Sequence, residues 1–90
     1  MNWRALPGGD LIAEGLADLS ARRVTQAAAL VSIGAPRLRT LGVAPEHVLE
    51  NPERCLYDLL AAEGEDGAHS RYKAMVRRLV SFERAIACVR

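Results

Sequence analysis

The side chains best suited to bind a metal or to undergo redox chemistry are two histidines and two cysteines. Their spacing predicts no metal or redox site. His69 follows Glu65 and Asp66 closely, but a turn before a helix naturally collects acidic residues, and no third ligand stands at helical spacing. Cys55 and Cys88 are far apart and form no CxxC pair, so we expect two reduced thiols. We therefore predict neither a metal nor a cofactor.

The sequence also lacks the patterns that mark common active sites. It contains no GxSxG, P-loop, GxGxxG or HExxH motif, and no serine has an obvious base partner. Glu83 falls among the apolar residues of the last helical stretch, where a carboxylate is costly unless it is paired. We expect an ion pair with Arg37 or Arg39 rather than catalysis, because no second polar group of suitable geometry is identifiable. The sequence favours a protein that is not an enzyme.

The last 22 residues, His69 to Arg90, predict one helix that carries six basic residues beside large apolar ones. The apolar residues recur at spacings of three and four, which places them on one side of a helix. With other amphipathic helices in the chain, this stripe is expected to be a core face rather than a coiled-coil seam. Its members are Tyr72, Met75, Leu79, Phe82, Ile86 and Val89.

The opposite side of this helix is the predicted partner-binding surface. Counting about 100° per residue, small side chains gather there between basic flanks, so another helix could approach closely. Arginine suits such a surface because its planar fork binds carboxylates through two hydrogen bonds. We expect an acidic protein partner, or self-association, on the following residues: Arg77, Arg78, Arg84, Ala74, Ser81 and Ala85.

The segment 25–43 offers an alternative function, as a helix-turn-helix that binds DNA through Arg37 and Arg39. Three features depart from that motif. Leu30 stands where a small residue usually allows close helix contact, Thr40 stands where a buried aliphatic residue is usual, and Pro36 restricts the turn. DNA binding is therefore kept as the alternative interpretation.

Glycine and proline divide the rest of the chain into helical segments, and no segment alternates like a strand. Asp10 is placed to cap the first helix, and Gly34 is expected to end the second before Pro36 starts a third. The pattern predicts an all-α fold, a compact bundle of about five helices with a long C-terminal helix. The expected helices are 10–22, 25–33, 36–41, 51–63 (with Asn51 as cap and Pro52 as first residue) and 67–90, with an arm at 1–9 and a loop at 43–50.

Length and composition predict a single helical domain over residues 1–90. Half of the residues are hydrophobic, and twelve basic against eleven acidic residues give a net charge of +1. That balance argues against the strong positive field of a DNA-coating protein. The N-terminus has no secretory signal, and no stretch approaches the roughly 20 apolar residues that cross a bilayer. We expect a cytoplasmic protein that does not bind membranes.

Three stretches, "LPGGDLIAEGLADL", "LVSIGAPRLRTLG" and "LYDLLAAEGEDGAHSRYKAMVRRLVSFERA", cover most of the chain. Together they resemble a group of small uncharacterised helical bacterial proteins that are encoded beside nucleotidyltransferase-like proteins of toxin–antitoxin or defence pairs. The resemblance includes no mechanistic motif and assigns no functional residue. It implies a small accessory or antitoxin-like subunit that docks on the transferase.

Overall fold

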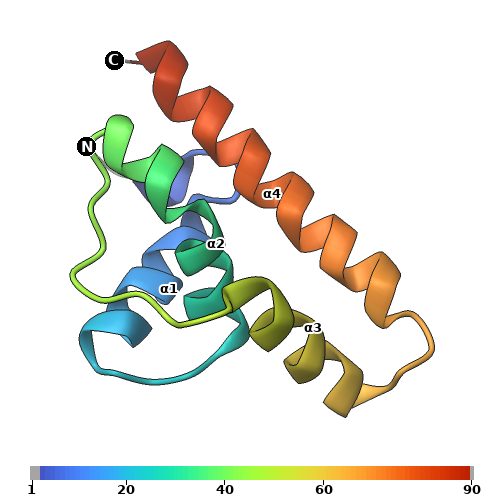
Figure 1. Cartoon of the computed structure of the whole chain (residues 1–90). Coiled ribbons are helices and arrows are strands. Elements are labelled where there is room, and N and C mark those ends of the chain that lie inside the picture. Colours follow the sequence, from blue (N-terminus) through green and yellow to red (C-terminus); the bar gives the residue numbers. More distant parts are fainter. Residues whose placement is uncertain (1–2, 90) are drawn as a thin grey trace.

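Over residues 3–89 the chain folds into four α-helices and a short 3-10 turn, which confirms the all-α fold with a long C-terminal helix. A computed structural model describes residues 3–89, so the expected helix end at Arg90 lies outside the described residues. Figure 1 shows α1 and α2 side by side, with α3 and the long α4 along one edge. The elements are η1 (Trp3–Ala5), α1 (Gly9–Ser20), α2 (Gln26–Thr40), α3 (Pro52–Glu63) and α4 (Ala68–Val89).

Helix α1 has different ends from those predicted. It begins at Gly9 after Gly8, so Asp10 lies inside the first turn and is not the cap. It ends at Ser20 because Arg22 takes a left-handed conformation, with φ of 59°. The amide of Arg23 then donates to the carbonyl of Asp18 at 2.8 Å, which is the closing bond of a Schellman turn.

Helix α2 corrects the prediction of two separate helices between residues 25 and 41. The helix is continuous from Gln26 to Thr40 and passes through both Gly34 and Pro36. Gly34 is a contact position rather than a stop, because a Cβ built there would lie 2.7 Å from Cδ1 of Leu79 on α4. Pro36 is exposed and removes one backbone bond, a loss that the buried face of the helix outweighs.

The continuity of α2 also overturns the structural basis of the helix-turn-helix interpretation. A helix-turn-helix needs a turn near the middle of segment 25–43, and the structure has none there. Arg37 and Arg39 instead lie in the last turn of α2, where both are exposed. DNA binding through these two arginines stays a prediction without that motif.

Helix α3 begins as predicted, with Asn51 before it and Pro52 as its first residue. Asn51 has a left-handed backbone, and its side chain makes no capping hydrogen bond. The loop expected at 43–50 contains no helix. It is tied to α2 by Ser32, whose hydroxyl accepts from the amide of Leu49 at 3.0 Å and donates to the carbonyl of Ala28 at 2.9 Å.

The core lies where α2 meets the other helices. The buried members of the predicted α4 stripe, Leu79, Phe82 and Ile86, are at most 4% exposed and join this core. α1 and α2 approach closely at Gly15, where a Cβ would lie 2.4 Å from the carbonyl oxygen of Ala27. The fully buried large residues, led by Phe82, are Ile12, Leu19, Leu30, Leu38, Leu56, Leu60, Ile86, Val31 and Val43. Within residues 3–89, none of the helices combines the length and apolar character needed to span a bilayer.

Candidate protein-binding face of the last helix

Helix α4 is held by one face only, and this asymmetry positions the candidate site. Its 22 residues make a rod about 33 Å long. Phe82 and Ile86 anchor it in the core, while Ser70 and Ser81 on the outer side are exposed. The predicted stripe ends earlier than expected, since Val89 is 54% exposed where the end of α4 projects beyond the other helices (Figure 1). The reverse of α4 is therefore open to solvent.

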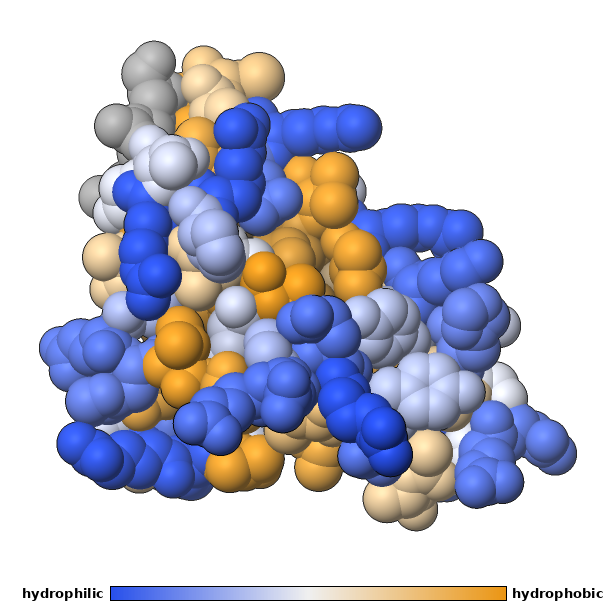
Figure 2. Space-filling view, in the orientation of Figure 1, coloured by the Kyte–Doolittle hydropathy of each residue, from blue (hydrophilic) through white to orange (hydrophobic). Residues whose placement is uncertain are grey.

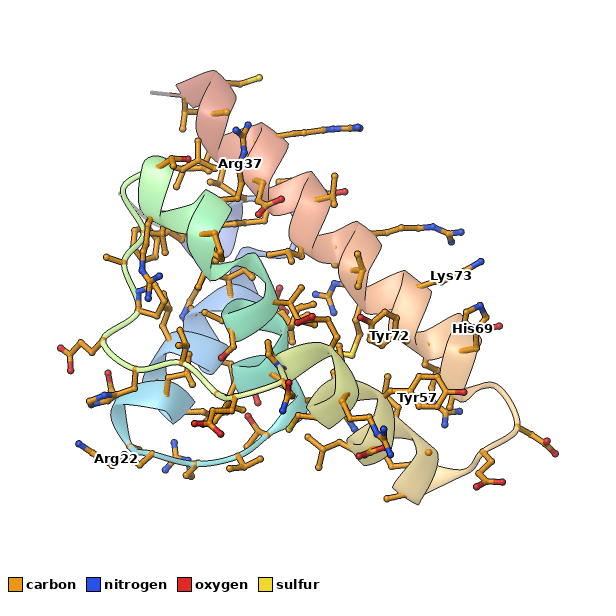
Figure 3. All side chains as sticks on the ribbon, viewed as in Figure 1. Arg22, Arg37, Tyr57, His69, Tyr72 and Lys73 are labelled. Carbon is orange, nitrogen blue, oxygen red and sulfur yellow. The ribbon has the colours of Figure 1, made fainter. Side chains whose placement is uncertain are left out.

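Three cations of α4 form a basic ridge, which we define as Lys73, Arg77 and Arg84. All three are exposed, and within residues 3–89 the structure shows no ion pair or side-chain hydrogen bond for any of them. At 1.5 Å per residue the ridge extends about 16 Å along the helix. Figure 2 shows hydrophilic side chains projecting along this edge of the molecule, and in Figure 3 Lys73 and His69 point away from the protein body.

Arg78 belongs to a different environment from Arg77 and Arg84, although the sequence grouped the three. Its Nη2 donates to Oδ1 of Asp10 on α1 at 3.0 Å. Both side chains are about half exposed or more, so the pair orients them with a small stabilising effect. Sequence reasoning missed this contact because the two residues are 68 positions apart, beyond the reach of any helical pattern. Arg78 is thus engaged by its own chain.

A hollow of about 360 Å³ lies beside this pair, between α4 and the other three helices. Its floor is apolar and includes Leu11, Leu60 and Met75. Ala74 and Arg78 line its rim, so two predicted partner-binding residues face the hollow while Arg77 and Arg84 are not part of its lining. Across the hollow, Nε2 of Gln26 donates to Oε1 of Glu63 at 2.8 Å.

Arg71 also lines this hollow, and its role is structural. Its Nη2 donates to the carbonyls of Leu60 at 3.0 Å and Gly64 at 2.7 Å, which are backbone acceptors left open where α3 ends. The Nε atom is buried and has no hydrogen-bond partner within the described chain. Arg71 therefore joins the end of α3 to the start of α4.

Glu83 lies half-buried near the edge of the core, and the ion pair predicted for it is not formed. In the described part of the chain, neither Arg37 nor Arg39 makes an ion pair with its carboxylate. Burial raises the pKa of the Glu83 carboxyl above its ordinary value, and the nearby charge of Arg37 offsets part of that rise. The charged form of the carboxylate is therefore slightly unfavourable in the folded protein.

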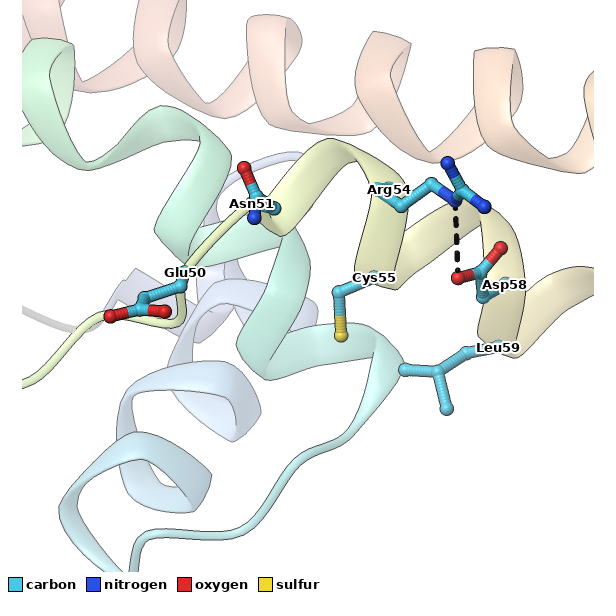
Figure 4. A pocket seen from close by; sticks show the side chains of 6 residues that line it. All are labelled: Glu50, Asn51, Arg54, Cys55, Asp58 and Leu59. Carbon is cyan, nitrogen blue, oxygen red and sulfur yellow. Dashed lines mark ion pairs between the residues drawn. The ribbon is translucent and has the colours of Figure 1, made fainter.

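A second hollow at the start of α3 surrounds Cys55 (Figure 4). It is shallow and open, and the ion pair across it, Arg54 Nε to Asp58 Oδ2 at 3.4 Å, joins two exposed side chains. Cys55 and Cys88 are both free thiols. Among residues 3–89 no three histidine, cysteine or acidic side chains gather as metal ligands would.

The polar residues that are most firmly organised lie at the corner between α1 and α2. Asp18 is only 6% exposed, and its Oδ1 accepts from Nη2 of Arg23 at 2.9 Å. Its Oδ2 accepts from Oγ1 of Thr25 at 2.7 Å, and that hydroxyl accepts from the amide of Ala28 as the cap of α2. Arg22 stands four residues after Asp18 at helical spacing, but the carboxylate pairs with Arg23 instead, because the left-handed backbone at Arg22 brings Arg23 back to it.

The exposed side of α4 presents long cations and small side chains on a helix that is fixed by its other face. Comparison with other proteins does not add to it: no protein family model, no curated protein and no solved structure matches this chain.

Proposed function

We propose that this protein is a non-enzymatic interaction module that binds an acidic protein through the outer face of α4. The observation that carries the proposal is the pair Arg77 and Arg84, which are exposed and have no ion pair or side-chain hydrogen bond within residues 3–89, on a helix whose other face is fixed in the core. A fixed helix holds the guanidinium groups in place before binding, which lowers the ordering cost of association.

The small residues beside the arginines support a helical partner. Ala74 and Ser81 are exposed and Ala85 is half-buried, so a second helix could lie close to the α4 backbone between the arginines. Each guanidinium could then bind a partner carboxylate through two parallel hydrogen bonds. Arg78 would contribute at the rim, after exchanging or sharing its contact with Asp10.

The class of partner follows from the resemblance described above. In this proposal the protein is the accessory or antitoxin-like subunit of a nucleotidyltransferase-like protein, and both act in the cytoplasm, where Cys55 and Cys88 stay reduced. The alternative of a DNA-binding protein has less support, because segment 25–43 lacks the required turn.

The decisive experiment is co-expression with the nucleotidyltransferase-like product of the adjacent gene, followed by size-exclusion chromatography. We expect the wild-type protein to co-elute, and Arg77→Glu with Arg84→Glu to weaken the complex by roughly a hundredfold or more. A matched control, Arg22→Glu with Arg39→Glu, changes the net charge equally at exposed sites outside the face. The complex should survive the control.

Two outcomes would contradict the proposal. The first is a complex that is unaltered by Arg77→Glu with Arg84→Glu, which would exclude the outer face of α4 as the binding surface. The second is salt-dependent binding of duplex DNA by the protein alone that is lost with Arg39→Glu, which would favour the alternative function.

A further inference from the structure

The charges of this chain are separated into two neighbouring regions of opposite sign. Residues 52–66 contain five acidic residues and one arginine, a net charge of −4, although the whole chain has a net charge of +1. Residues 68–90 contain six basic residues and one glutamate, a net charge of +5. The acidic segment, which we define as residues 52–66, comprises α3 and the turn after it. It lies next to α4 along one edge of the molecule (Figure 1).

These opposite charges do not neutralise each other within the chain. In residues 3–89, no ion pair joins an acidic residue of the acidic segment to the basic ridge. The contact of α4 with the end of α3 goes to the backbone carbonyls of Leu60 and Gly64, not to a carboxylate. Three acidic side chains of the segment are exposed and without a partner in the described chain: Glu53, Glu65 and Asp66.

We infer that the occupant of these two surfaces is a second copy of this chain, in a dimer that places the acidic segment of each copy against the basic ridge of the other. Opposite net charges on two surfaces of one molecule make it complementary to itself. Because α3 and α4 are neighbours, a two-fold axis beside them lets both contacts form at once. A head-to-tail arrangement would leave one surface free at each end and would grow into open filaments.

The dimer uses the same basic ridge as the proposed partner binding. The inference therefore rests on the proposed function and extends it. Self-association and binding of an acidic partner compete for Lys73, Arg77 and Arg84. Because exposed charges are screened by salt, the dimer is expected to be electrostatic and salt-sensitive. The protein would therefore keep its ridge covered by another copy until an acidic partner displaces it.

The first test is sedimentation equilibrium of the full chain at two ionic strengths. At about 0.01 M salt, where the Debye length is about 30 Å, we expect a mass near twice 9.8 kDa. At about 1 M salt, where it is about 3 Å, we expect the monomer mass. A monomer at both ionic strengths over the whole accessible concentration range would overturn the inference.

The second test exchanges the signs of the two surfaces. A ridge-reversed variant (Arg77→Glu, Arg84→Glu) and an acid-reversed variant (Glu53→Lys, Glu65→Lys) should each be monomeric, with dissociation constants raised by roughly 10- to 100-fold. Mixed together, they should form a one-to-one heterodimer, because the acidic segment of the first meets the ridge of the second and the two reversed surfaces also attract. Circular dichroism of each variant checks that the fold is kept.

The mixture protects the test against a simple folding failure. Misfolded variants would lose helical signal, and folded variants that stay monomeric when mixed would overturn the dimer. The acid-reversed variant also separates this inference from the proposed function, since its ridge is intact. It should still capture the nucleotidyltransferase-like partner, whereas the ridge-reversed variant should not. A wild-type monomer that captures the partner would remove the dimer and leave the proposed function in place.

Discussion

At the corner between α1 and α2, a guanidinium and a hydroxyl bind one carboxylate, whereas the basic ridge of α4 has no partner in the described chain. Arg23 and Thr25 both donate to Asp18, which is almost completely buried. Arg77 and Arg84 extend into solvent from a helix that is just as firmly anchored. The same residue type thus serves folding in one region and is left available in the other. The partner binding that we propose uses the second region, whose charges make no ion pair or side-chain hydrogen bond within residues 3–89.

The largest effect is expected from breaking the α1–α2 corner with Asp18→Asn. The change removes the charge that Arg23 and Thr25 share and weakens the cap of α2, so we expect Tm to fall by about 10 °C at neutral pH. Thermal melts followed by circular dichroism measure it. A Tm within the error of the wild type would contradict the structural role of this corner.

The pH dependence of the same variant gives a sharper test. Hydrogen bonds from Thr25 and then Arg23 hold the pKa of Asp18 below its ordinary value of 3.8. The stability that this lowered pKa confers is complete above pH 3.8 and is lost as the pH falls through the pKa in the folded state. The difference in urea midpoint between wild type and Asp18→Asn should therefore shrink as the solution is acidified.

A smaller effect should separate two arginines of the same helix. Arg71→Ala removes two hydrogen bonds to the end of α3, and we expect the free energy of unfolding to fall by about 1 kcal/mol. Arg77→Ala removes no ion pair or side-chain hydrogen bond of the described residues and should change the free energy of unfolding by less than about 0.5 kcal/mol. Urea denaturation of both variants tests the distinction, and equal losses would show that Arg77 has a structural contact after all.

The helical fold was predictable from sequence because it depends on short-range patterns. The spacing of Phe82 and Ile86 identified the buried face of α4, and Asn51 with Pro52 located the start of α3. The helix break at Gly34 was wrong because packing decided it: the missing side chain accommodates Leu79, a residue of α4 that is 45 positions later. A glycine in the sequence can mark either a turn or a close contact between helices. Only the tertiary structure distinguishes the two.

The position of the candidate face on α4 was predictable from sequence, but which of its arginines have partners within the chain was not. Helical spacing put Arg77 and Arg84 on the outer side of α4, where the structure has them exposed. It could not show that Arg78 is engaged by Asp10 from the other end of the chain. Nor could it separate Arg71, which binds carbonyls of α3, from cations that have no partner. Which charges are free depends on long-range contacts, so a periodic pattern alone overestimates the binding surface.

The smallest expected effect concerns Glu83 and has the opposite sign to that of Asp18. Burial raises the pKa of Glu83, and Arg37 compensates only in part, so the charged form is disfavoured in the folded protein. The corresponding stability is complete below the ordinary pKa of 4.5 and is lost as the pH rises through the pKa in the folded state. Glu83→Gln should therefore stabilise the protein at neutral pH, by about 0.5 kcal/mol because solvent still reaches the carboxylate. Below pH 4 the gain should disappear, and urea titrations at pH 7 and pH 4 measure both. A loss of stability at pH 7 would instead mean that Arg37 and Glu83 form a stabilising pair. Glu83 would then be, like Asp18, a carboxylate whose charge stabilises the fold.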